Sequence, residues 1–170
     1  MRRLALVLAL LVAGCTKPAA SPRDAGLNAA ALVDDCTLAT PLVPGVPGSP
    51  GYLIPSERNP NGASELATHM RRMADDLRAS RAALLDGGSA LLLWASHRKL
   101  RCAWPTALSD RNEAYDAMAQ TYLGAVRALD AKPSSREAYT GVVAACRACH
   151  EQTCDGPIAV IDGLGLDASP

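Results

Sequence analysis

The sequence predicts an all-α protein, an up-down-up-down four-helix bundle that follows a Pro/Gly-rich tether. Ala and Leu dominate the composition, Phe is absent and aromatic residues make up only 4% of the chain, which favours small-residue helix packing over a β-rich core. From Ser64 onward, apolar residues recur at intervals of three and four, the period of a helix with one buried face. Only a few residues separate these periodic stretches, so consecutive helices should be antiparallel neighbours.

Residues 1–14 have the pattern of a signal peptide. Two arginines precede an apolar stretch that is too short to span a bilayer. The stretch ends in Leu-Val-Ala-Gly-Cys, which resembles the bacterial lipobox, after which the signal is cut and the cysteine is lipidated. We expect Cys15 to carry this membrane anchor. Because Thr16 rather than Asp follows, the lipobox pattern points to the outer membrane, facing the periplasm of a Gram-negative bacterium. An ordinary signal peptide with a chance cysteine is the alternative.

Residues 15–63 differ from the rest of the chain in composition. Prolines with interspersed Gly and Ser exclude a long helix there, among them Pro22, Pro41, Pro44, Pro47, Pro50, Pro55 and Pro60. We expect an extended or partly ordered tether without chemistry of its own.

The first two helices are expected at about 64–85 and 90–104. Ser64 is a candidate cap for the first helix, which should stop at Asp-Gly-Gly, residues 86–88. The second must end before Pro105. One face of the first helix carries the apolar residues Leu66, Met70, Met73, Leu77 and Leu84.

The third and fourth helices each begin at a predicted capping box. These boxes are Asp110-x-x-Glu113 and, after Pro133, Ser134-x-x-Glu137. The apolar face of the fourth helix ends in two cysteines and a histidine, which should therefore face the core. The bundle is expected to span residues 64–154, followed by a tail, 155–170, whose apolar patches could lie against it.

The pentapeptide Cys146-Arg147-Ala148-Cys149-His150 is the most informative motif. Two thiols at this spacing can each add to a vinyl group of one porphyrin, and the adjacent imidazole is placed to bind its iron. The pattern therefore predicts one covalently attached haem c, with Cys146 and Cys149 as thioether residues and His150 as proximal ligand. A disulfide or half of a metal site are the alternatives.

The distal ligand follows from the expected topology. In an up-down-up-down bundle, the start of the first helix and the end of the fourth share one end, so Met70 and His150 should lie near each other. Met70 is the predicted distal iron ligand. An unoccupied distal position is the next alternative, followed by ligation through Met73, His97 or His69. A further alternative is that Met70 only packs in the core.

Residues 64–152 resemble the cytochrome c′ family and its low-spin monohaem relatives, because a helical, exported chain carries C-x-x-C-H near its C-terminus. The resemblance implies haem attachment through the last helix, and in low-spin members a Met early in the first helix, which Met70 matches. The resemblance does not decide whether the chain forms a homodimer of the kind common in the family. The short second helix, the extra Cys102 and Cys154, and the few aromatics depart from the family pattern.

Three of the six cysteines remain after lipid and haem are assigned. An oxidising compartment favours a disulfide, and Cys102 and Cys154 are expected at the same end of the bundle. The sequence therefore predicts a Cys102–Cys154 bridge, with Cys36 free or an alternative partner.

These features predict a carrier of single electrons rather than an enzyme, exchanging electrons with a redox partner protein. The 17 basic and 17 acidic residues form no basic stripe for nucleic acid, and no Gly-rich phosphate loop or Ser/His/Asp signature is present. A gas-binding haem protein with a vacant distal face, for nitric oxide or carbon monoxide, is one alternative. A haem-free structural lipoprotein is the other.

Overall fold

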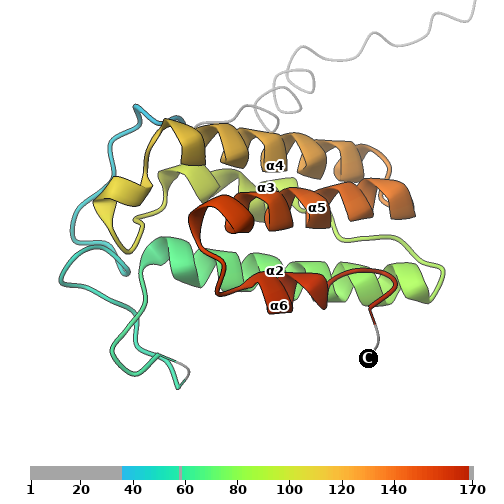
Figure 1. Ribbon diagram of the computed structural model, residues 1–170, viewed down its shortest axis with the longest axis horizontal. Helices are drawn as coiled ribbons and strands as arrows, with labels where there is room; N and C mark the ends of the chain where they lie inside the picture. The colour runs from blue at the N-terminus through green and yellow to red at the C-terminus, as the bar shows by residue number, and fades with distance from the viewer. Residues whose placement is uncertain (1–35, 58, 169–170) are drawn as a thin grey trace, which may run out of the picture. The chain divides into compact units, whose positions relative to one another are not determined.

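The computed structural model describes residues 36–57 and 59–168 (Figure 1). The predicted signal peptide, the lipidation site Cys15 and the first part of the tether lie outside the described residues. No helix in the described ranges is long and apolar enough to cross a membrane.

The described part of the chain is all-helical, as predicted, and its one β feature is an isolated bridge between Ile54 and Ala63. Its α-helices are α2 (Glu65–Leu85), α3 (Trp94–His97), α4 (Glu113–Ala131), α5 (Arg136–Thr153) and α6 (Ile158–Asp162). Two 3₁₀ segments complete it, η1 (Arg98–Cys102) and η2 (Leu108–Asp110). In Figure 1, α4 and α5 form an antiparallel pair, with α2 and α6 on the other side of the core.

Side chains cap the three long helices close to the predicted positions. Ser64 caps α2 as expected, with its hydroxyl accepting from the Ala67 amide. The caps of α4 and α5 are Asn112 and Ser135, one or two residues beyond the predicted Asp110 and Ser134. Asp110 instead belongs to the 3₁₀ segment η2, where its carboxylate accepts from the amide of Ala107.

The second predicted helix is much shorter than 90–104. It consists of the single turn α3 followed by the 3₁₀ segment η1. The carboxylate of Asp130, near the end of α4, accepts from the amides of Leu93 and Trp94 at 2.8 and 2.9 Å. The Ala90 amide bonds to the carbonyl of Pro133. These tertiary acceptors set the helix start at Trp94, because they satisfy the amides of a first turn from another part of the chain.

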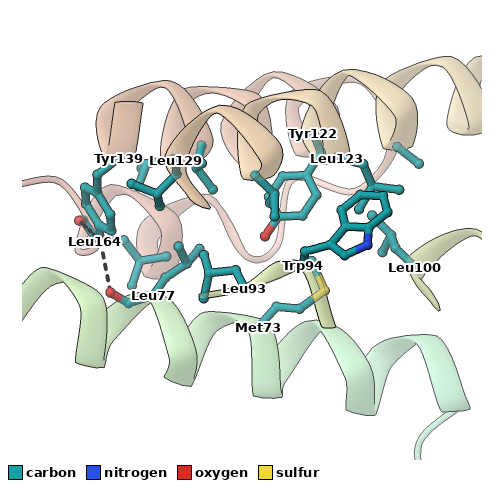
Figure 2. Close-up of a cluster of buried hydrophobic side chains, with 14 of the residues drawn as sticks. Met73, Leu77, Leu93, Trp94, Leu100, Tyr122, Leu123, Leu129, Tyr139 and Leu164 are labelled. Carbon is teal, nitrogen blue, oxygen red and sulfur yellow. Dashed lines mark hydrogen bonds between the residues drawn. The ribbon is translucent and has the colours of Figure 1, made fainter. Parts of the chain in front are cut away.

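The core lies between α2 on one side and α4 with α5 on the other. Figure 2 shows Met73 and Leu77 of α2 facing Tyr122, Leu129 and Tyr139. The fully buried Tyr139 hydroxyl lies 3.1 Å from the Leu77 carbonyl oxygen and 2.8 Å from that of Leu164. One side chain thus ties α5 to α2 and to the C-terminal tail.

The tail packs against the helices, as its apolar patches suggested. Ile161 and Leu164 are buried, and Arg81 of α2 donates to the carbonyl oxygens of Gly165 and Ala168. Arg147 of α5 forms an ion pair with Asp162 at 2.9 Å.

Residues 36–57 and 59–63 are ordered against the helices, so this half of the predicted tether is not an extended spacer. Arg111 donates to the carbonyl oxygens of Thr37 and Thr40, and the Trp104 indole donates to that of Val43. Gly48 has φ of +92°, and a Cβ there would lie 2.2 Å from the Glu65 amide nitrogen. Glycine is therefore required where this segment crosses the start of α2.

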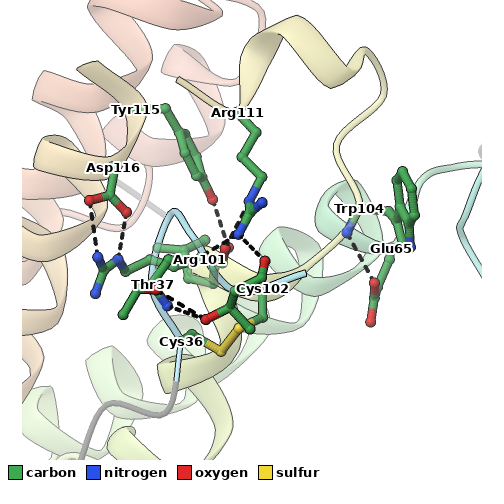
Figure 3. The surroundings of a disulfide bond; sticks show 11 residues. Cys36, Thr37, Glu65, Arg101, Cys102, Trp104, Arg111, Tyr115 and Asp116 are labelled. Carbon is green, nitrogen blue, oxygen red and sulfur yellow. Dashed lines mark hydrogen bonds and ion pairs between the residues drawn. A yellow bond between two sulfur atoms is a disulfide. The ribbon is translucent and has the colours of Figure 1, made fainter. Parts of the chain in front are cut away.

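The predicted Cys102–Cys154 disulfide is wrong. Cys102 pairs with Cys36, with a Cα–Cα distance of 5.4 Å, while Cys154 is an unpaired, exposed thiol (Figure 3). The ordered 36–40 segment brings Cys36 onto η1, and Cys154 instead lines a cavity at the end of α5.

Candidate functional site

A large cavity lies between α2 and the C-terminal half of α5. Its volume is about 780 Å³, within the usual range for small-molecule and cofactor sites. Ser64, Leu100, Tyr115 and His150 all line it. The start of α2, η1, the start of α4 and the end of α5 therefore meet around this cavity.

The predicted site residues share this cavity. Cys146, Cys149 and His150 line it from α5, and Met70 lines it from α2. The rest of the lining is largely apolar and includes residues that sequence reasoning did not assign to a site: Leu66, Leu77, Met118, Ala119, Tyr122, Val160, Ile161 and Leu164. Val160, Ile161 and Leu164 come from the tail, whose apolar patches indicated packing on the helices but no role in a site.

Both motif cysteines are free thiols with raised pKa values. Burial, with a further contribution from Cys149, raises the pKa of Cys146 to about 12. Burial also raises the pKa of Cys149, against a smaller opposing effect of the Thr153 hydroxyl. Dithiol redox enzymes depend on a lowered cysteine pKa, because the thiolate is the nucleophile. The surroundings of this pair are the opposite of those in such enzymes.

His150 is held in one tautomer by the backbone. Its Nδ1 lies 2.9 Å from the carbonyl oxygen of Cys154, and the Cys154 amide caps α5 by bonding to the His150 carbonyl. A carbonyl oxygen can only accept, so Nδ1 carries the hydrogen and the Nε2 of the neutral ring keeps its lone pair. Such a second hydrogen bond is the usual way in which a ligating histidine is oriented.

The three methionines of the lining differ in burial. Met70 is half-buried, Met73 is 6% exposed, and both come from α2. Met118, which the sequence ranking omitted, lines the cavity from α4. Met70 and Met73 therefore remain candidate ligands, joined by Met118.

The remaining two histidines lie outside the large cavity. His69 and His97 line a smaller cavity of about 320 Å³, with Met73 common to both cavities. Both ring nitrogens of His97 already have partners, Tyr122 and Asp76. This arrangement removes His97 as a ligand in the large cavity.

Charged side chains gather at the α2 side of the cavity. Arg71 and Arg78 line it, and Arg78 forms an exposed ion pair with Asp75. Arg72 does not line the large cavity but belongs to the smaller one.

A network of polar contacts supports this end of the domain (Figure 3). Arg101 donates from two nitrogens to the two carboxylate oxygens of Asp116, at 2.7 and 3.0 Å, in a largely buried ion pair. The hydroxyl of Tyr115 donates to the carbonyl of Leu100, and Glu65 accepts from the amide of Trp104. These bonds join α2, η1 and α4 around the cavity.

Comparisons with protein families, with curated proteins and with solved structures found no match to this chain. Within residues 36–57 and 59–168, no three His, Cys, Asp or Glu side chains are grouped so as to hold a metal ion by themselves. One wall of the large cavity nevertheless offers two thiols and an imidazole nitrogen, and the α2 wall offers a thioether.

Proposed function

We propose that this protein is a monohaem c-type cytochrome that carries single electrons. Cys146 and Cys149 would hold one haem by thioether bonds, and His150 would be the proximal iron ligand. The observation that carries this proposal is the shared cavity: all three motif residues and Met70 line one space of cofactor size. We infer an arrangement like that of a four-helix-bundle cytochrome, with α3 and η1 in place of a full second helix.

The residues present fit this cofactor. The Nδ1–H of His150 is bound to the carbonyl of Cys154, which leaves Nε2 as the nitrogen that would bind iron. The two thiols are unpaired, and the cavity walls are mainly apolar, which favours haem burial. When bound, the haem supplies a reversible one-electron change at its iron. The protein orients the ring and limits the access of water to it.

Methionine on the α2 wall favours electron transfer over gas binding. A thioether from Met70 would keep the iron six-coordinate in both oxidation states and raise its potential, so that little rearranges on electron exchange. An open distal face would instead leave a coordination position for nitric oxide or carbon monoxide. The spectrum of the purified protein separates the two.

The decisive experiment is expression of the full chain in a host with a cytochrome c maturation system. The purified protein should keep its colour after acid–organic extraction, and its mass should include one haem. The Cys146→Ala/Cys149→Ala variant should be colourless, whereas Cys154→Ala should stay coloured as a matched control. Colour that leaves with the solvent would exclude thioether attachment, and a colourless chain of unmodified mass would favour a haem-free structural lipoprotein.

We also propose that Cys15 carries a lipid anchor on the periplasmic face of the outer membrane, close to a redox partner protein. The lipobox pattern and Thr16 support this location. Fractionation of cells labelled with a fatty acid should place the wild-type chain in the outer membrane. The Cys15→Ser variant should lose both label and membrane association, and a labelled Cys15→Ser chain would contradict the assignment.

A further inference from the structure

His97 connects the large cavity to the protein surface. Its ring is 0% exposed, with Nδ1 2.7 Å from the Tyr122 hydroxyl and Nε2 3.2 Å from a carboxylate oxygen of Asp76. Tyr122 lines the large cavity, and Asp76, whose side chain is 34% exposed, lines the smaller one. The three side chains thus form a continuous hydrogen-bonded path from the proposed haem site to solvent.

The hydrogen-bond roles along this path follow from the chemistry of its ends. The carboxylate of Asp76 only accepts, so Nε2 of His97 carries a hydrogen. In the neutral ring, Nδ1 accepts from the Tyr122 hydroxyl. Uptake of a proton at Nδ1 reverses that bond, since Nδ1–H then donates to the phenol oxygen. The path therefore accommodates both states of His97 without breaking a hydrogen bond.

Charges from two helices act on His97. From α2, Asp76 favours its cation and His69 opposes it, with Arg72 and Asp75 also lining the small cavity. From α4, Asp130 favours the cation, and Tyr122 is kept as a neutral phenol because burial raises its pKa well above the usual value. Burial is the largest influence and lowers the pKa of His97, with the Asp76 hydrogen bond opposing it.

We propose that Tyr122, His97 and Asp76 form a redox-linked proton site, in which His97 takes up one proton when the haem is reduced. The inference rests on the proposed function. One electron comes from a one-electron donor, and one proton comes from solvent and is bound at Nδ1 of His97. The net charge of this end of the domain is then unchanged by reduction. Tyr122 lies between His97 and the cavity, so the positive charge that His97 gains is close to the proposed haem. Its attraction to the added electron stabilises the reduced state.

The test is the midpoint potential of the holoprotein, measured by equilibrium redox titration between pH 5 and 8. The proton site makes the potential fall with rising pH, between the pKa of His97 in the oxidised and in the reduced protein. Because burial lowers the first value, this window begins below pH 6.5. The full slope is about 59 mV per pH unit, the shift of a one-electron couple for a tenfold change.

Two histidine variants identify the group. His97→Gln should flatten the slope, because an amide keeps hydrogen bonds but does not titrate in this range. His69→Gln is the matched control, since His69 lines the same small cavity but is not part of the path. The midpoint potential of this variant should keep the wild-type dependence on pH. A slope that survives in His97→Gln, or a flat wild-type potential, would overturn the proposal.

A second measurement uses only the wild-type protein, so its result does not depend on whether the variants fold. The pKa of the His97 imidazole, followed by NMR, should be higher in the reduced than in the oxidised holoprotein, and equal values would refute the link. Failure of the proposed function is seen separately, as the absence of a covalently bound haem before any potential is measured.

Discussion

The hydrogen bond from Nδ1 of His150 to the carbonyl of Cys154 shows how a single residue pair can determine the orientation and tautomer of an imidazole. Cys154 also ends α5, so the residue that stops the helix is the one that orients the imidazole. Burial controls the chemical state of Cys146 and Cys149 in turn. It raises their pKa values and so keeps both sulfurs as protonated thiols rather than reactive thiolates.

Substitution of each lining methionine should identify the distal ligand. Met70→Ala should convert a low-spin spectrum into a high-spin one that shifts with carbon monoxide, because the sulfur ligand is lost. Met73→Ala should keep the low-spin spectrum but cost about 2–5 kcal/mol in unfolding free energy, as expected for a truncated core methionine. Met118→Ala tests the third candidate, from α4, and should also keep the low-spin spectrum. An unchanged spectrum in Met70→Ala would remove Met70 from the site.

Asp116→Asn should destabilise the protein by about 3 kcal/mol at pH 7, because the largely buried guanidinium of Arg101 loses the carboxylate charge that it binds. The hydrogen bond from Arg101 lowers the pKa of the Asp116 carboxyl below its usual value. The carboxylate's contribution is therefore complete above the unfolded-state pKa of about 4 and is lost as the pH falls through the lower folded-state value. Urea unfolding at pH 7 and pH 3 should show the variant and wild type converging in acid. A constant difference would contradict this account.

At the scale of elements, the segment made of residues 36–57 and 59–63 covers η1 near the cavity. Its attachments include the Cys36–Cys102 bond, the two carbonyls bound by Arg111, and the Val43 carbonyl bound by Trp104. The short α3 and η1 leave room that a full second helix would occupy, and this segment covers η1 instead (Figure 3).

Removal of the Cys36–Cys102 disulfide should cost about 2–4 kcal/mol, because the bond closes a long loop in the unfolded chain. Denaturant unfolding of Cys36→Ser/Cys102→Ser checks the size of the effect. Cys154→Ser should unfold like the wild type, since its thiol is exposed and unpaired. A larger loss in Cys154→Ser, or a Cys102–Cys154 peptide in a non-reduced digest, would contradict the observed pairing.

At the scale of the whole molecule, the cavity means that the polypeptide alone leaves much apolar surface unfilled. The α2 and α5 helices meet mainly through core side chains at the Tyr139 end, whereas the cavity separates them at the other. Apolar surface that a ligand would bury makes folding and binding linked events.

Loss of the proposed haem should therefore lower the stability of the entire domain. The colourless Cys146→Ala/Cys149→Ala protein should unfold at a lower temperature than the holoprotein, because the apolar lining of the cavity then lacks the ligand that would bury it. Thermal unfolding and binding of a hydrophobic dye measure the effect. Equal unfolding temperatures and no dye binding would show that the cavity is not a cofactor space.

The features that sequence alone determined are local ones. The Ser64 cap, the helical periodicity of α2, α4 and α5, and the joint position of Cys146, Cys149 and His150 depend on residues within one or two turns of each other. Short connections then bring Met70 to the same end, because antiparallel neighbours leave few alternatives.

Tertiary structure decided the features that join distant residues. Asp130 sets the start of α3 from 36 positions away, and Arg111 holds a segment 71 and 74 residues earlier in the chain, which brings Cys36 rather than Cys154 to Cys102. The path through Tyr122, His97 and Asp76 likewise comes from three separate elements. Such pairings depend on which side chains the packed core brings within hydrogen-bond distance, and the local sequence pattern does not indicate which side chains those are.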